Sequence, residues 1–153
     1  TPRRMKATNL FACAGINQYY LSNIGVDVVL ANELEPDRAK LHHALYPNCT
    51  MVIGDITSPK VQDKLAEIAN EEQPEILLAS PCCQQITRAN TRKDEDSDEQ
   101  YLFEAVMEHL KRCPSYKFCV IENAEDMLIF KTKKYELPLG DQIEKELKKQ
   151  ASS

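Results

Sequence analysis

The sequence has no long hydrophobic run and no segment that resembles a signal peptide. Its apolar stretches, such as residues 26–31, are far shorter than the ~20 residues that a membrane-spanning helix needs. No charged segment followed by an apolar one stands near the first residue, so we expect the six cysteines to be reduced thiols in a cytosol. A membrane protein and a disulfide-rich secreted protein are both disfavoured.

Clustered metal ligands and an excess of basic residues are also absent. No CxxC pair occurs and the three histidines are not spaced as zinc ligands, so we expect no metal site. The formal net charge of −5 argues against the whole chain being a general nucleic-acid binder. The locally basic stretch KTKKYELPLGDQIEKELKKQASS alternates Glu with Lys, which is more typical of a solvated helix face than of a phosphate-binding track.

The sequence does contain enough apolar residues for one domain with a core, because 153 residues are too few for two ordinary domains. Strand and helix patterns alternate along the chain, which predicts an α/β fold with a mostly parallel sheet and helices on both faces. The first predicted strand lies within residues 6–15, which close in a tight turn, and the other predicted strands are residues 26–33, 49–56, 74–80 and 116–123. The predicted helices are residues 16–25, 36–47, 58–72 and 101–113. The acidic stretch at residues 92–100 is expected to be a mobile loop.

Small and polar residues follow each predicted strand, at the edge where parallel sheets bind ligands. Glu33 ends the second strand, where a carboxylate can accept hydrogen bonds from ribose hydroxyls, although a surface glutamate in a loop is an equal alternative. Asp55 could hold an adenine amino group, but a lone aspartate after a strand is more often a cap or turn residue. The first turn contains only Gly15, which argues against a nicotinamide-dependent enzyme.

Two adjacent cysteines follow the fourth strand in the stretch LLASPCCQQITRAN, residues 77–90. A thiolate at a strand-to-loop junction can act as a nucleophile, although a buried cysteine is more often structural. Glu122 ends the next strand, where its carboxylate could face the same crevice. A carboxylate after an apolar strand is costly unless it is solvated or has a function, so this arrangement favours a catalytic pair.

In this order, LFACAG, ANE, GDI, SPCCQ and IENAEDM resemble the motifs of the DNA cytosine methyltransferases that methylate carbon 5, over residues 8–127. The family's fourth motif contains Pro-Cys-Gln, and its sixth reads Glu-Asn-Val. An ungapped match makes Gln84 the family's glutamine, Cys83 its nucleophile and Thr87 its Ser/Thr, with Cys82 in the place of a second proline. The alternative register makes Cys82 the nucleophile and inserts a residue before Gln84.

The resemblance implies a truncated Rossmann-like fold of S-adenosylmethionine-dependent methyltransferases, with residues 1–153 forming a single, incomplete catalytic domain. Glu33 would hold the ribose of the cofactor. The other residues implied to bind the cofactor line the first turn or hold the adenine, and they are Phe11, Cys13, Ala14, Gly15, Ile16, Leu34, Asp55, Ile56 and Leu102. The sequence departs from the family at Cys13 and Ile16, where glycine is usual, at Cys82, at Ile86 and in the acidic stretch.

The resemblance also implies a mechanism on a cytosine that is flipped out of double-stranded DNA. The Cys83 thiolate would add to carbon 6, and Glu122 would hydrogen-bond N3 and the exocyclic amine while carbon 5 takes the methyl group. Gln84 and Asn123 complete the implied catalytic set.

Later parts of the family are not found in the sequence: a Gln-x-Arg-x-Arg strand, a target-recognition domain and the closing cofactor motif. We therefore expect the chain to act with a second subunit or a C-terminal half that carries the recognition domain. A catalytically inactive interaction or regulatory module is the alternative. A prokaryotic or phage restriction-modification setting fits the resemblance.

Overall fold

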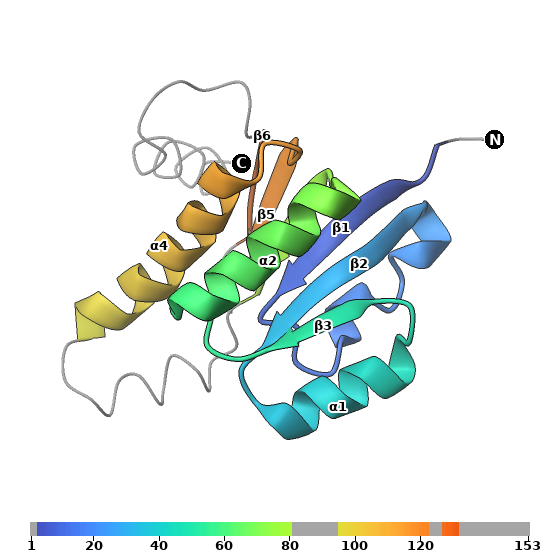
Figure 1. The fold of residues 1–153 in the computed structure, drawn as a ribbon. Coiled ribbons are helices and arrows are strands. Elements are labelled where there is room, and N and C mark those ends of the chain that lie inside the picture. The colour runs from blue at the N-terminus through green and yellow to red at the C-terminus, as the bar shows by residue number, and fades with distance from the viewer. Residues whose placement is uncertain (1–2, 81–94, 123–126, 132–153) are drawn as a thin grey trace.

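The computed structural model describes residues 3–80, 95–122 and 127–131, and these form a sheet with helices (Figure 1). The six strands run in the order β3-β2-β1-β4-β5-β6. Their bounds are β1 Met5–Leu10, β2 Val26–Glu33, β3 Thr50–Ile53, β4 Ile76–Ala79, β5 Phe118–Glu122 and β6 Met127–Lys131. The α-helices are α1 Pro36–Leu45, α2 Pro59–Glu72 and α4 Glu95–Arg112.

Strand β1 lies in the middle of the sheet and determines where a ligand can bind. It pairs in parallel with β2 on one side and with β4 on the other, so Leu10 is aligned with both Asn32 and Ala79. The chain moves from β1 toward β3 and later from β4 toward β5, which makes the β1/β4 boundary the topological switch point. The parallel pairing of the first five strands confirms the predicted α/β fold.

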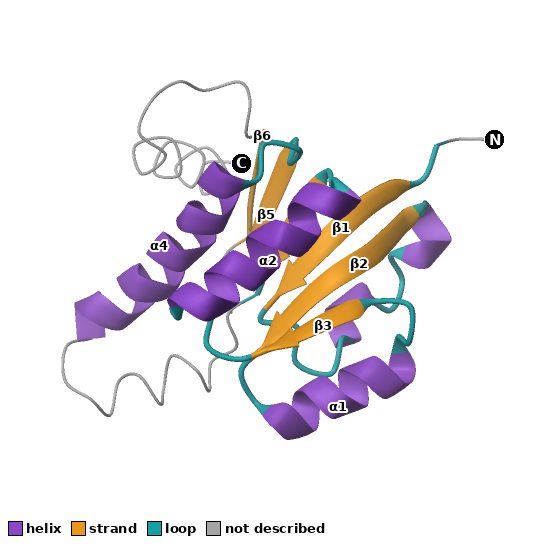
Figure 2. Ribbon diagram, in the orientation of Figure 1, coloured by secondary structure: helices purple, strands orange, loops and turns teal. Residues whose placement is uncertain are grey.

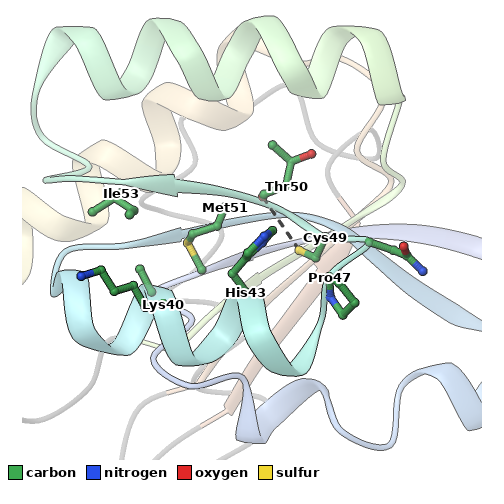
Figure 3. Close-up of a pocket in the computed structure, with 9 residues that line it drawn as sticks. Lys40, His43, Pro47, Cys49, Thr50, Met51 and Ile53 are labelled. Carbon is green, nitrogen blue, oxygen red and sulfur yellow. Dashed lines mark hydrogen bonds between the residues drawn. The ribbon is translucent and has the colours of Figure 1, made fainter.

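Helices cover both faces of the sheet, as predicted (Figure 2). Helices α2 and α4 contact each other on one face. Helix α1 packs against β2 and β3 on the other face, so that β3 lies between α2 and α1 (Figure 3). The main core fills the space beneath α2 and α4, where fully buried side chains include Leu10, Leu30, Leu65 and Leu77. Burial of each leucine contributes about 2 kcal/mol to folding.

Helices α1 and α2 begin as their sequences predict. Pro36 and Pro59 stand in the first turns, where a missing backbone N–H costs nothing, and Asp37 adds a negative charge near the N-terminus of α1. Among the described residues, no helix is long and apolar enough to span a membrane.

Two expectations from the sequence are wrong, and one strand was missed. Residues 16–25 form two short 3-10 turns, Ile16–Gln18 and Ser22–Ile24, instead of a helix. The reason is that Asn17 and Gln18 turn their side chains toward Asn9 of β1, which fixes a path that an α-helix would not allow. Residues 95–100 begin helix α4 rather than lying in a loop, because acidic residues stabilise a helix N-terminus. Strand β6, antiparallel to β5, was not anticipated.

Candidate cofactor and catalytic site

The carboxyl ends of five parallel strands meet at one edge of the sheet, and the predicted site residues follow these ends. Glu33 is the last residue of β2 and Glu122 is the last residue of β5. Two strands, β1 and β4, lie between them. Three strand spacings separate β2 from β5, or roughly 14 Å. The edge therefore has a β1/β2 half and a β4/β5 half.

The turn after β1, residues 11–15, bends sharply back toward β2. Phe11, Cys13 and Gly15 have φ values of 56°, 51° and 82°, which lie in the left-handed region. The Gly15 N–H donates to Ala12 O at 2.8 Å, and the Ala12 N–H donates to Asn32 O at 3.0 Å. Two non-glycine residues in this region cost about 1 kcal/mol each, so the surrounding contacts must enforce the turn. This backbone strain lies within the predicted cofactor-binding segment.

Glu33 is buried, with 1% of its surface exposed, and its carboxylate faces this turn. The Cys13 N–H donates to Glu33 Oε2 at 3.3 Å. Burial raises the pKa of Glu33, and the Cys13 N–H, the charge of Arg38 and the Leu34 N–H partly offset this rise. Among the described residues, Glu33 Oε1 has no hydrogen-bond partner. The alternative of a surface glutamate is therefore wrong, and one buried carboxylate oxygen can still accept a hydrogen bond.

The turn after β3 lies beside Glu33. The Gly54 N–H donates to Glu33 O at 3.0 Å, which brings the predicted adenine-binding segment next to the predicted ribose-binding residue. Asp55 Oδ1 accepts hydrogen bonds from Thr57 N and Thr57 Oγ1 at 2.9 and 2.8 Å. Asp55 thus has the turn role that the sequence left open as an alternative, and its side chain remains exposed.

The apolar residues of the predicted cofactor site differ in exposure. Phe11 and Ile56 are buried in the main core, and half-buried Leu102 packs against that core from α4. Leu34 and Ile16 are 40% and 84% exposed. Half-buried Cys13 and Ala14 lie in the first turn with buried Gly15. The structure brings Cys13 to Glu33 and Gly54 beside it, whereas the side chain of Ile16 is exposed.

The predicted catalytic residues fall mostly outside the described part of the chain. Cys83, Gln84 and Asn123 lie outside it, as do Cys82, Ile86 and Thr87 of the same motif. Glu122 is described as the last residue of β5. Because Ala79 is aligned with Ile121, the described ends of β4 and β5 lie side by side at the β4/β5 half of the edge.

A groove of about 510 Å³ lies elsewhere, between α1 and the edge strand β3 (Figure 3). It is lined by side chains that include Lys40, His43 and Met51. None of the residues predicted to bind cofactor or substrate lines it. Within the described residues, no group of three His, Cys, Asp or Glu side chains is placed to hold a metal ion.

Sequence reasoning missed a buried polar network beneath the first turn. Asn9 Nδ2 donates to Asn17 Oδ1 at 3.0 Å and to Gln18 Oε1 at 2.9 Å, and His42 Nε2 lies 2.8 Å from the same Gln18 oxygen. Tyr46 Oη donates to Gly15 O at 2.7 Å. A polar residue within the apolar first strand was the available signal for Asn9, because a buried amide needs partners.

Comparisons with known proteins agree with this geometry. The family model of C-5 cytosine-specific DNA methylases matches residues 5–148. The chain is 37% identical over 131 residues to the type II methyltransferase M1.HgaI of Avibacterium volantium, covering 82% of this chain and 36% of that protein. The chain therefore spans about a third of the length of this relative.

Solved structures share the fold at low sequence identity. A putative DNA modification methyltransferase encoded within an E. coli prophage has a TM-score of 0.59 at 17% identity, over 97% of this chain and 38% of that one. The S. pombe Dnmt2 methyltransferase has a TM-score of 0.57 at 18% identity, over 79% of this chain and 35% of that one. The fold is thus the Rossmann-like methyltransferase fold, and the chain belongs to the C-5 cytosine-specific DNA methylase family.

Proposed function

We propose that this chain is the cofactor-binding and catalytic part of an enzyme that transfers a methyl group from S-adenosylmethionine to carbon 5 of cytosine in DNA. Family membership over residues 5–148 supports the reaction class. The observation that carries the proposal is Glu33, a buried carboxylate at the carboxyl end of β2 with one oxygen that has no partner among the described residues. The ribose hydroxyls of a nucleoside cofactor can donate hydrogen bonds to this oxygen.

The residues around Glu33 fit a nucleoside. The strained turn at residues 11–15 brings backbone close to the carboxylate, and the absence of a Cβ at Gly15 allows Tyr46 and His42 to pack against the other side of this turn. Phe11 and Ile56 follow β1 and β3 and are buried in the main core, which anchors these two segments. Glu33 would hold the ribose, and the segment Leu34 with Asp55 and Ile56 would hold the adenine. Bound S-adenosylmethionine supplies an electrophilic methyl group.

The reaction requires carbon 5 of cytosine to become nucleophilic. In the proposed sequence of steps, the Cys83 thiolate forms a bond to carbon 6, and Glu122 stabilises the resulting enamine at N3 and the exocyclic amine. Carbon 5 then takes the methyl group, a base removes the proton from carbon 5, and the carbon–sulfur bond breaks to release Cys83 as a thiolate. Gln84 and Asn123 would position the loop and the base.

We propose that DNA recognition requires a second subunit or a C-terminal half. The net charge of −5 gives this chain little attraction for phosphates, and M1.HgaI is nearly three times as long as the part that matches it. The 3-10 turns beside the cofactor segment expose large apolar side chains, which supports the proposal that this second part packs against them. These are Ile16, Tyr19, Tyr20 and Ile24, each at least 66% exposed.

An inactive regulatory module is the second candidate. The observations that favour it are the loss of glycine at Cys13 and Ile16 and the intrusion of Cys82 beside the nucleophile. Such a module would keep the sheet and would not form a covalent bond to cytosine.

Calorimetric titration of S-adenosylmethionine and S-adenosylhomocysteine tests the cofactor site. We expect saturable binding that weakens about tenfold or more in Glu33→Gln, because hydrogen bonds to charged groups are worth about 1.5–3 kcal/mol. Exposed Glu71→Gln is the matched control. Equal affinities for the two variants would refute the role of Glu33.

Tritium release from carbon 5 of cytosine in DNA separates the two candidates. The assay is run with and without the C-terminal part of a related enzyme. Release that disappears in Cys83→Ser and persists in Cys82→Ser would support catalysis by Cys83. Release that disappears only in Cys82→Ser would move the nucleophile to Cys82, and no release with the second half present would favour the regulatory module.

A further inference from the structure

The turn at residues 11–15 adopts a conformation that its own sequence does not favour. Phe11 and Cys13 have positive φ values without being glycine, so something outside the turn must hold it. The contacts that could do so come from β2 and from the end of α1. The Ala12 N–H is tied to Asn32 O of β2, and the far side of the turn meets Tyr46 and His42.

Tyr46 follows the last residue of α1 and reaches the turn directly. Its hydroxyl donates to Gly15 O at 2.7 Å, and the Gln18 N–H donates to the same oxygen at 3.1 Å. A Cβ at Gly15 would collide with the Tyr46 ring and would lie 2.8 Å from His42 Cδ2. The ring of Tyr46 also packs against that of His42, with centroids 4.9 Å apart. The end of α1 therefore binds the backbone of Gly15 and fills the space that a side chain at this position would need.

His42 reaches the next residues of the turn through Gln18. Its side chain is fully buried, and Nε2 lies 2.8 Å from Gln18 Oε1. Because this amide oxygen can only accept, Nε2 must carry the proton. Asn9 Nδ2 donates to the same oxygen from β1, so Gln18 is held between the sheet and α1.

We propose that Tyr46 and His42 are positioning residues that hold the turn at residues 11–15 in its cofactor-binding conformation, so that α1 controls the affinity for S-adenosylmethionine. This proposal rests on the proposed function. The two side chains do not touch the proposed cofactor position. They act through Gly15 and Gln18, which keeps the Cys13 N–H directed at Glu33 Oε2.

Tyr46→Phe in the full chain tests the direct contact, because it removes the hydroxyl and keeps the ring. Exposed Tyr20→Phe is the matched control, since it makes the same chemical change on the surface nearby. Hydrogen–deuterium exchange of peptides spanning residues 11–18 reports on the turn without any ligand. We expect amide exchange there to be about three- to tenfold faster in Tyr46→Phe, as for the loss of one hydrogen bond, and unchanged in Tyr20→Phe.

Affinity for S-adenosylmethionine is measured on the same variants by calorimetry. The dissociation constant should rise about three- to tenfold in Tyr46→Phe, while urea denaturation shows that both variants remain folded under the binding conditions. Unchanged exchange at residues 11–18 would overturn the proposal. Faster exchange with unchanged affinity would overturn it as well, because the turn would then not control binding.

His42 provides an independent arm with a conservative rescue. His42→Leu removes the donor to Gln18, whereas His42→Gln keeps an N–H donor at a similar reach. We expect faster exchange and weaker binding in His42→Leu and recovery of most of both in His42→Gln. Equal behaviour of the two variants would overturn the role of this hydrogen bond. If the unmodified chain binds no cofactor, the proposed function fails, and exchange at residues 11–18 alone then decides whether α1 holds the turn.

Discussion

The buried hydroxyl of Tyr116 offers the sharpest test of how the two halves of the sheet are joined. Tyr116 lies just before β5 and is 2% exposed. Its hydroxyl donates to Thr8 Oγ1 of β1 at 2.6 Å and lies 2.7 Å from His109 Nε2 of α4. The perturbation is Tyr116→Phe, which removes only this oxygen.

The expected loss follows from the groups that the substitution leaves without partners. Thr8 and His109 are both fully buried, so water does not replace the missing hydroxyl. An orphaned buried polar group costs about 1–3 kcal/mol, so two of them make Tyr116→Phe about 2–6 kcal/mol less stable. Adding Thr8→Val removes one orphan, so the double variant should lose about 1 kcal/mol less than the sum of the two single losses.

Urea denaturation followed by circular dichroism measures these free energies of unfolding, with exposed Tyr20→Phe as the control that should change them by less than about 0.5 kcal/mol. Strict additivity in the double variant would refute the coupling of Tyr116 to Thr8. A loss below about 0.5 kcal/mol for Tyr116→Phe would refute the expected size of the effect, because the hydroxyl would then contribute nothing measurable to the free energy of unfolding.

Three further predictions follow from described residues. Gly15→Ala should lower the free energy of unfolding by about 2–4 kcal/mol, from left-handed strain plus overpacking against α1, and unchanged urea midpoints would contradict this. Burial lowers the pKa of His109 to about 4, so between pH 6.5 and pH 4 the imidazole is protonated in the unfolded chain but not in the folded one. The free energy of unfolding should therefore fall by up to about 3 kcal/mol as pH drops from about 6.5 to about 4. Urea midpoints across this range should show a smaller fall in His109→Gln. Burial raises the thiol pKa values of Cys49, Cys113 and Cys119. Iodoacetamide at pH 8 should therefore alkylate these three cysteines only after urea is added, which peptide mass mapping would detect.

Much of the fold could be predicted because the strands are short, apolar and followed by polar residues. Strand β2 and helix α2 agree with their predicted ranges to within a residue. The segment after Gly15 could not be predicted in the same way. Its apolar residues have helical spacing, yet Ile16, Tyr19 and Tyr20 are exposed, while polar Gln18 is buried. A tertiary hydrogen bond to Asn9 decided the local structure, and spacing alone carries no information about it.

The candidate site was predicted in part for the same reason. The position of Glu33 at a strand end followed from the pattern, but its burial and its bond to the Cys13 N–H depend on how the first turn folds. His42 and Tyr46 were missed because they lie on α1, far along the chain from the turn that they contact. Cys83, Gln84 and Asn123 lie outside the described residues and stay predictions.

The central place of β1 has a consequence for the order in which the chain can fold during synthesis. This strand precedes the others in the chain, yet one of its edges pairs only with the later strand β4. The hydroxyl of Thr8 accepts its hydrogen bond from Tyr116, 108 residues later. A nascent chain that ends before Ile76 would leave one edge of β1 with unpaired backbone groups, which is the kind of edge that promotes aggregation. Strand β1 therefore ties productive folding to the synthesis of almost the entire sheet, and contacts of such long sequence separation are expected to make that folding slow.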